Sequence, residues 1–338
     1  MEKKLNILVY ASVFYPGIGG IENHTLFLVK EFVRQGHAVK VVTEQVQDPN
    51  RPLDNIEVIH ASGFLNQLRA FFWSDLVYMP NITLKGIWLF AFNPFKKWVI
   101  SHNDFHLMYT SDWKTKFKNY LISKASANIS VSKSVAAFLK VPSDVIYNCY
   151  DNDVFKLYPE EKREFDFVFV GRLVSQKGCE LLIDACSELE QKFTLNIVGD
   201  GFEYEKLQQK VKNMNLESQI KFLGFKKGED LARCLNQHKT MIVPSLDVEG
   251  FGIVALEGLA CGCQMIVSDA GGLPEAVGEF ARVFPMKDKH TLKLYLNNAM
   301  SHNTNIQNSD ALNQFLANHS KSSVAKDYLT VFNQIILN

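Results

Sequence analysis

Short apolar runs alternate with longer amphipathic patterns from one end of the chain to the other. This alternation predicts parallel sheets covered by helices, because each parallel strand needs a crossover connection to the next. In the first half the expected strands are 6–12, 39–43, 57–60, 75–79, 98–101, 128–131 and 144–147. The clearest helix is 22–35, where Leu26, Val29 and Val33 recur at helical spacing and Gly36 follows as a stop.

The same alternation restarts after a polar stretch. The expected strands there are 165–170, 194–198, 220–223, 241–244 and 264–268, and the expected helices are 177–189, 203–214 and 252–260. We therefore expect two doubly wound, Rossmann-like α/β domains that face each other across a cleft. The expected boundaries are a first domain 1–150, a linker 151–164, a second domain 165–320 and a C-terminal helix 321–338 that packs back on the first domain.

Chain length and net charge limit the number of domains and the classes of partner to be considered. The 338 residues, 47% of them apolar, are enough for two domains with a core each. The formal net charge is zero, which argues against a nucleic-acid partner. Residues 1–150 contain 16 Lys and Arg against 11 Asp and Glu, so the first domain carries +5 and the remainder carries −5.

The cysteines and the apolar runs indicate a cytoplasmic protein. None of the six cysteines lies in a CxxC pair or at zinc-ligand spacing from histidines, so we expect free thiols and no metal site. The N-terminus lacks the features of a signal peptide. No apolar stretch reaches the roughly 18 residues that a transmembrane helix needs.

A basic glycine-rich turn follows the strand 165–170. The segment from Gly171-Arg172 to Lys177-Gly178 lies where a strand ends and a helix begins. Helix N-terminal amides attract anions, and Arg and Lys add full positive charge, so this turn is a candidate diphosphate site. The alternative is an ordinary solvated basic loop, and the glycine spacing is not that of a Walker motif.

Two glutamates eight residues apart follow the strand 241–244. Glu249 stands in a glycine-containing loop, and Glu257 lies more than one turn into the next helix. Carboxylates at two depths can each accept hydrogen bonds from a separate polyol. The alternative, a local pair for Glu257 and a merely exposed Glu249, is less favoured because the helix around Glu257 is apolar.

Together these motifs resemble glycosyltransferase family four, the retaining glycosyl transferases group 1 of GT-B fold. The matching segments are Gly-Arg-Leu-x-x-x-Lys-Gly, then 198–201, 222–224, Glu-Gly-Phe-Gly with Glu257 eight residues on, and 271–275. They cover most of residues 165–280 in the family's order and spacing.

The resemblance implies a role for each matching residue of the second domain. Arg172 and Lys177 would hold the donor diphosphate, Glu257 the ribose, and Glu249 would face the transferred sugar. Whether Glu249 acts as a nucleophile or stabilises positive charge stays open, and we favour front-face attack assisted by the leaving phosphate. The remaining donor-binding residues implied there are Gly171, Gly201, Phe225, Lys226, Phe251, Gly252 and Ile253.

The first domain matches the family at fewer positions. Residues 15–22 resemble its glycine-rich loop, which implies that Gly19 and Gly20 approach the donor phosphates. His102 lies where the family has a histidine that touches the donor sugar, although His106 competes for this role. Read alone, the glycines also allow a dinucleotide fold, but the full fingerprint is absent.

Aromatic and basic residues are interleaved between 64 and 124. We expect Trp113, Lys114, Lys116 and Lys118 to contact an anionic membrane surface or the acceptor. The alternative is a packed core with an ordinary solvated face, which we favour for 88–92 and Trp98.

The resemblance implies a metal-independent retaining hexosyltransferase that needs no cofactor. It would move a sugar from a UDP-sugar, or else a GDP- or ADP-sugar, to a glycan or lipid-linked acceptor in bacterial surface polysaccharide or glycolipid synthesis. We expect it in the cytoplasm, peripheral on the inner face of the cell membrane. The rival functions are a non-catalytic sugar-nucleotide-binding subunit, an epimerase or phosphorylase of the same fold, and a dehydrogenase as the weakest.

Overall fold

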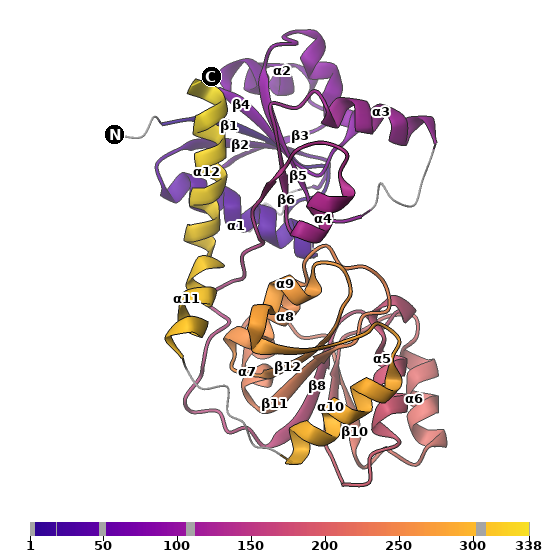
Figure 1. Cartoon of the computed structure of the whole chain (residues 1–338). Helices are drawn as coiled ribbons and strands as arrows, with labels where there is room; N and C mark the ends of the chain where they lie inside the picture. The colour runs from indigo at the N-terminus through magenta and orange to yellow at the C-terminus, as the bar shows by residue number, and fades with distance from the viewer. Residues whose placement is uncertain (1–3, 18, 47–51, 106–111, 302–308, 338) are drawn as a thin grey trace. The chain divides into compact units, whose positions relative to one another are not determined.

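The computed structural model describes residues 4–17, 19–46, 52–105, 112–301 and 309–337. The chain divides into two compact units, and each is described by itself (Figure 1). Unit 1 comprises Met1–Cys149 and Asn318–Asn338, and unit 2 comprises Tyr150–Ala317. None of the helices in the described ranges is both long enough and apolar enough to cross a bilayer.

Unit 1 contains a parallel seven-stranded sheet of order β3-β2-β1-β4-β5-β6-β7. All seven strands expected from the apolar runs are present, with small shifts of their ends. They are β1 (Asn6–Tyr10), β2 (Ala38–Thr43), β3 (Glu57–His60), β4 (Leu76–Pro80), β5 (Lys97–His102), β6 (Ala127–Ser130) and β7 (Asp144–Val145).

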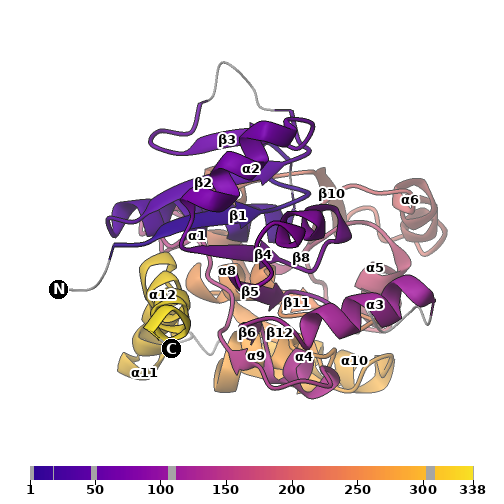
Figure 2. The same ribbon diagram turned by 90° about the horizontal axis from the view of Figure 1, so that it is seen from above.

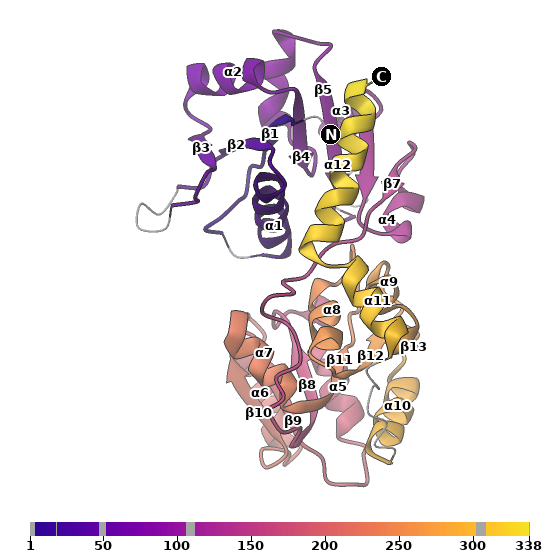
Figure 3. The ribbon, with the colours of Figure 1, turned by 90° about the vertical axis from the view of Figure 1, so that its left-hand side faces the viewer.

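Helices cover both faces of this sheet and bury its apolar side chains in two separate cores. One core is closed by α1 (Gly20–Arg34) and α12 (Lys321–Leu337). The other is closed by α2 (Phe64–Trp73), η1 (Leu84–Ala91) and α3 (Trp113–Ile122) (Figures 2 and 3). The short helix α4 (Lys133–Phe138) follows β6. This arrangement is typical of a doubly wound α/β unit.

The C-terminal helix α12 packs on unit 1 through aromatic side chains. The rings of Tyr328 and Phe332 are each centred 5.6 Å from the ring of Tyr78 on β4. Phe332 also lies 5.5 Å from Phe32 of α1. All four side chains are fully buried, so α12 completes the core of a sheet whose strands come from the other end of the chain.

Unit 2 contains a parallel six-stranded sheet of order β10-β9-β8-β11-β12-β13. Its strands are β8 (Phe165–Val170), β9 (Leu195–Val198), β10 (Ile220–Gly224), β11 (His238–Val243), β12 (Gln264–Ser268) and β13 (Ala281–Phe284). Its helices are α5 (Cys179–Cys186), α6 (Tyr204–Asn213), α7 (Gly228–Asn236), α8 (Ile253–Ala260), α9 (Leu273–Val277), α10 (Lys289–Ser301) and α11 (Asp310–Asn318). Of these, β13 and four helices, α7, α9, α10 and α11, were not expected from the sequence.

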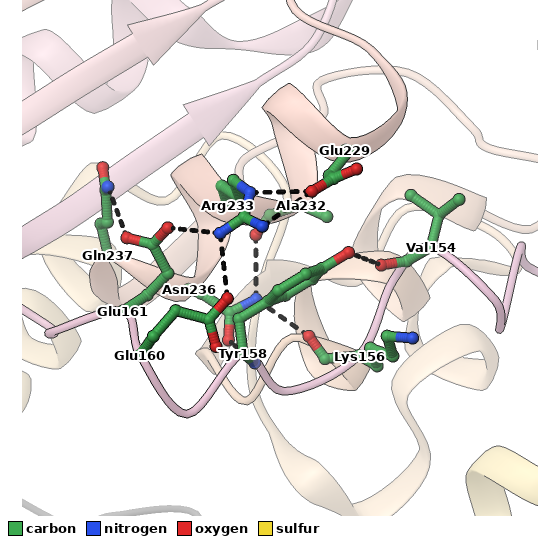
Figure 4. Close-up of polar contacts among 10 residues, drawn as sticks. All are labelled: Val154, Lys156, Tyr158, Glu160, Glu161, Glu229, Ala232, Arg233, Asn236 and Gln237. Atoms are coloured by element: carbon green, nitrogen blue, oxygen red, sulfur yellow. Dashed lines mark hydrogen bonds and ion pairs between the residues drawn. The ribbon is translucent and has the colours of Figure 1, made fainter.

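Residues 151–164, expected as a linker, belong to unit 2 and are held against α7 (Figure 4). The guanidinium of Arg233 lies 2.8–3.0 Å from carboxylate oxygens of Glu160, Glu161 and Glu229. It also lies 4.8 Å from the ring centre of Tyr158. A network of this kind stabilises more than an isolated surface pair, so the chain enters β8 from a fixed position.

A buried histidine lies in the seam between α1 and α12. His24 Nδ1 is 3.4 Å from Cys149 Sγ, and the ring of His24 is centred 6.2 Å from that of Tyr328. His24 Nε2 has no hydrogen-bond partner among the described residues. Burial therefore disfavours the charged imidazolium and lowers the pKa of His24 to about 3.

This lowered pKa predicts that unit 1 loses stability in acid. In the unfolded chain the pKa of a histidine is about 6.5, so unfolding takes up a proton below that pH. Between pH 7 and pH 5 the free energy of unfolding should fall by about 2 kcal/mol from His24 alone. The four tryptophans, residues 73, 88, 98 and 113, all lie in unit 1, so their fluorescence during urea unfolding reports this unit.

His24→Leu should remove that part of the pH dependence, whereas His60→Gln, at an exposed position, should keep it. An unchanged pH dependence in His24→Leu would contradict the assignment.

Candidate functional site

The loops that follow five neighbouring strands of unit 2 meet at the carboxyl edge of its sheet. Backbone hydrogen bonds join each loop to the next or to the neighbouring strand. They run from Gly171 N to Val198 O (3.0 Å), Leu173 N to Asp200 O (2.8 Å), Gly199 N to Gly224 O (2.9 Å), Leu246 N to Gln176 O (2.8 Å) and Gly272 N to Glu249 O (2.8 Å). This is the edge at which doubly wound sheets bind ligands.

The turn after β8 needs glycine at position 178. Gly178 has a φ of 72°, in the left-handed region, and a Cβ there would collide with the carbonyl oxygen of Pro244. Helix α5 starts directly after it without a side-chain cap, so its first amides remain available to an anion. Because residues 175–177 form a separate 3-10 turn, α5 begins two residues later than expected.

Lys177 and Glu249 form an ion pair across two of these loops. Lys177 Nζ lies 2.5 Å from Glu249 Oε1, and both side chains are partly buried. Ser245 Oγ donates a hydrogen bond of 2.6 Å to the same oxygen. Glu249 Oε2 has no partner among the described residues, so one carboxylate oxygen holds the lysine while the other is available to a ligand.

Ser245 was not predicted from the sequence. It directly follows the strand expected at 241–244 and stands four residues before Glu249, so its position at a strand end was the available signal.

Arg172 stands at the same edge, directly after Gly171. Its side chain is exposed and has no hydrogen-bond or ion-pair partner in the described part of the chain. In the next loop, Gly201 donates its N–H to Asp200 Oδ1 at 2.7 Å. Of the two cations in the loop after β8, Lys177 is paired and Arg172 has no partner among the described residues.

Helix α8 begins at this edge with Gly252 as its N-cap residue. Gly252 has a φ of 98°, and no side chain caps the first turn, which starts at Ile253. The ring of Phe251 is buried, so Phe251 can offer a ligand only its backbone. The three residues thus place uncapped amides at the start of α8.

Glu257 lies one turn into α8 and is partly buried. Its carboxylate has no hydrogen-bond or ion-pair partner among the described residues. Burial raises the pKa of Glu257 to about 8, and the negative charge of the nearby Asp151 adds to this rise. Carboxylates left without a partner in a fold usually have a functional reason.

The loop after β10 is exposed. Phe225 and the less exposed Lys226 lie there, directly after Gly224, which is bonded to the β9 loop. A second exposed ring, Phe202, follows the β9 loop and was not selected from the sequence. The described residues include no group of three or more His, Cys, Asp or Glu that could hold a metal ion.

Within unit 1, Gly19 precedes α1 as its N-cap residue and Gly20 starts that helix. His102 ends β5 and is buried, with Nε2 at 3.0 Å from Asn128 Oδ1. The competing His106 and the loop residue Ile18 lie outside the described residues.

Helix α3 carries the aromatic and basic residues expected at a surface. Trp113 is 69% exposed, and Lys114 Nζ lies 5.9 Å from its ring centre. Lys116 is exposed, Lys118 less so, and Thr115 and Ile122 form the buried side of the helix. The α3 segment is therefore a helix with an exposed aromatic and basic face.

Comparisons with known proteins agree on one family. The family described as glycosyl transferases group 1 matches residues 151–314. An uncharacterized glycosyltransferase of Methanocaldococcus jannaschii is 31% identical over 290 residues, covering 79% of this chain and 80% of its own. The GPI3 subunit of a phosphatidylinositol N-acetylglucosaminyltransferase of Saccharomyces cerevisiae is 24% identical over 316 residues, covering 80% and 70%.

A solved structure is similar over nearly the whole chain. Anabaena HepE in complex with UDP superposes with a TM-score of 0.82 at 21% identity, covering 98% of this chain and 100% of that one.

Proposed function

Because the chain belongs to the glycosyl transferases group 1 family, we propose that it is a retaining hexosyltransferase that takes its sugar from a nucleoside diphosphate. The two parallel-sheet units confirm the GT-B architecture expected from the sequence. The observation that carries the proposal is the Lys177–Glu249 pair flanked by unpaired Arg172 and Glu257 at one sheet edge.

Arg172 and Lys177 bind the donor diphosphate in this proposal. Their charges, with the uncapped amides of α5 and α8, stabilise the negative charge that grows on the diphosphate as the bond to the sugar breaks. Neutralisation by these groups makes a metal ion and any other cofactor unnecessary for the proposed reaction.

The proposed transfer is a front-face substitution. The bond from the sugar C1 to the diphosphate oxygen breaks, and the acceptor oxygen bonds to C1 on the same face. The acceptor proton passes to the leaving phosphate. Glu249 Oε1 fixes Lys177, and its free Oε2 faces the positive charge that develops on the sugar.

The remaining donor contacts follow from the edge of unit 2. Glu257 accepts hydrogen bonds from the ribose hydroxyls, and Phe225, Lys226 and the loop at Gly201 bind the base. UDP is the favoured nucleotide because Anabaena HepE, which has a similar fold, is described in complex with UDP. For unit 1 the proposal rests on the resemblance alone, which assigns Gly19 and Gly20 to the phosphates and His102 to the sugar.

We propose a glycan or lipid-linked acceptor in surface polysaccharide or glycolipid synthesis. The yeast relative is named for a phosphatidylinositol acceptor, which favours a lipid. The exposed Trp113 beside Lys114, Lys116 and Lys118 on α3 suits an anionic membrane surface, since tryptophan prefers the interface and lysines attract headgroups.

Arg172→Ala and Lys177→Ala test the diphosphate assignment. Each should weaken UDP binding by about tenfold to a hundredfold and leave uridine binding unchanged, since uridine has no phosphate. The slow hydrolysis of UDP-glucose should fall about a hundredfold or more. Calorimetric titration with both ligands measures the difference, and Lys221→Ala, at an exposed lysine of β10, is the matched control.

Equal losses for uridine and UDP would contradict this assignment. UDP binding without any hydrolysis or transfer in the wild-type protein would favour the non-catalytic alternative.

The raised pKa of Glu257 predicts that the affinity for UDP and uridine depends on pH. The ribose hydroxyls bind the carboxylate form, but the raised pKa keeps the free group mostly protonated at pH 7, so binding releases a proton. UDP and uridine affinity should rise by up to about tenfold per pH unit until pH 8 and then level off.

Glu257→Gln should bind both ligands more weakly and lose this pH dependence. Calorimetry in buffers of different ionisation enthalpy counts the released proton. If the variant kept the wild-type pH profile, the rise would come from another group.

The lysines of α3 are tested with vesicles. Replacing Lys114, Lys116 and Lys118 by Gln should weaken binding to anionic phosphatidylglycerol vesicles about a hundredfold at low salt, since each lysine contributes about 1 kcal/mol near such a surface. Replacing the three lysines of α6, a helix of unit 2, in the same way is the control and should leave sedimentation unchanged. Unchanged sedimentation of the α3 variant would reduce α3 to an ordinary solvated face.

A further inference from the structure

Helix α2 turns an apolar side outward. Phe64, Leu65 and Phe72 are exposed on it, while Gln67, Ala70 and Phe71 form its buried side. The segment after η1 continues this surface with Phe92 and with Phe95, which is 90% exposed. Side chains of this size rarely gather on the outside of a protein without something that covers them.

The exposed rings hold one another in place. Phe64 stacks on Trp88 of η1 with ring centres 4.8 Å apart, and Phe92 meets Trp88 edge-on at 6.1 Å. Phe64 and Phe92 are 6.4 Å apart. We call Phe64, Leu65, Trp88, Phe92 and Phe95 the aromatic ridge. Because Trp88 packs against the core and holds Phe64 and Phe92 beside it, these rings are already ordered for contact with an apolar phase.

The charge around the ridge is positive. Residues 62–97 contain four basic residues and a single acidic one, Asp75. Asp75 Oδ2 accepts a hydrogen bond of 2.7 Å from the N–H of Asn6, so its carboxylate is occupied inside the fold. Arg69 is exposed on α2 and has no partner among the described residues. Lys85 is paired with Glu44 at 2.6 Å and Lys96 lies near Asp75, so the charge left around these rings is that of Arg69 and Lys97. This combination of apolar rings and remaining positive charge fits an anionic lipid surface.

Helix α3 carries the same chemistry. Residues 113–124 contain four lysines and no acidic residue. Figures 1 and 3 both show α2 and α3 toward one end of unit 1, with α1 and α4 toward the other. Helices α2 and α3 therefore lie toward the same end of this unit.

We propose that the aromatic ridge inserts into the interface of a bilayer that carries anionic headgroups. The inference extends the membrane role proposed for α3 by a second, apolar contribution. The lysines of α3 attract the protein to the anionic membrane surface, and salt shortens the distance over which this attraction acts. Burial of the ridge in lipid is an apolar contribution that does not depend on salt. Two such contributions together give stable anchoring where one gives only weak binding.

Vesicle sedimentation at two salt concentrations separates the two contributions. The full chain is mixed with vesicles of phosphatidylcholine and phosphatidylglycerol, at low salt and at about 1 M salt, where charges are screened beyond about 3 Å. Wild-type protein should keep measurable binding at high salt. Leu65→Ser with Phe92→Ser and Phe95→Ser should lower that remaining binding by about tenfold or more.

Matched variants make the result decisive. Leu294→Ser with Leu337→Ser removes exposed apolar side chains elsewhere and should change nothing. The α3 glutamine variant should lose binding at low salt yet keep the salt-resistant part. Phe95→Ser alone, at the most exposed ring, serves if the triple variant does not fold, and should lower salt-resistant binding severalfold.

Two results would overturn the inference: no salt-resistant binding of the wild type, or equal salt-resistant binding of wild type and ridge variants. UDP affinity, a property assigned to unit 2, is measured in parallel. If the wild-type protein did not bind UDP, the proposed sugar transfer would be contradicted, whereas the vesicle result would stand.

Discussion

The ion pair between Lys177 and Glu249 is the interaction around which the edge of unit 2 is arranged. It joins the loop after β8 to the loop after β11, and the backbone of Glu249 is bonded in turn to the loop after β12. Both charges are partly buried, so each stabilises the other, and removal of one leaves the other with less compensation. Gly178 belongs to the same arrangement, since a side chain there would push the two loops apart.

The groups that this pair does not use define the chemistry. Arg172 remains exposed and positive, and Glu257 remains partly buried with a raised pKa. Neither side chain forms a hydrogen bond or ion pair with another described residue, and an unpaired carboxylate costs stability. A diphosphate and a ribose would satisfy both groups, which connects the local cost to the proposed donor.

Unit 1 also keeps side chains in positions that stability alone does not explain. Its sheet is covered on both faces, yet α2 and α3 expose aromatic rings beside basic side chains. The sequence pattern assigned the aromatics of 88–92 and Trp98 to the core. Trp98 is buried and Trp88 and Phe90 pack against the core, whereas Phe92 is half exposed. Periodicity could not separate these positions, because η1 is a 3-10 helix whose faces repeat differently from those of an α-helix.

Much of the fold could be predicted because long apolar runs in parallel sheets are buried on both faces. The strands at 165–170 and 264–268 match residue for residue. The prediction failed where local signals are weak. Helix α11 lies within a stretch that reads as polar, and its buried residue Leu312 gives little periodic signal. Strand β13 spans only four residues, and α7 is short.

The sequence by itself determined the α/β class, the two-unit division of strands and helices, and the set of charged residues at strand ends. It did so because apolar periodicity and glycine positions are local properties. Tertiary structure decided which of those charges meet. Lys177 and Glu249 are 72 residues apart, and their contact exists because β8 and β11 are neighbours in the sheet. Strand order is set by packing of the whole unit, so the pairing of Lys177 and the lack of a partner for Arg172 could be read only from the folded chain.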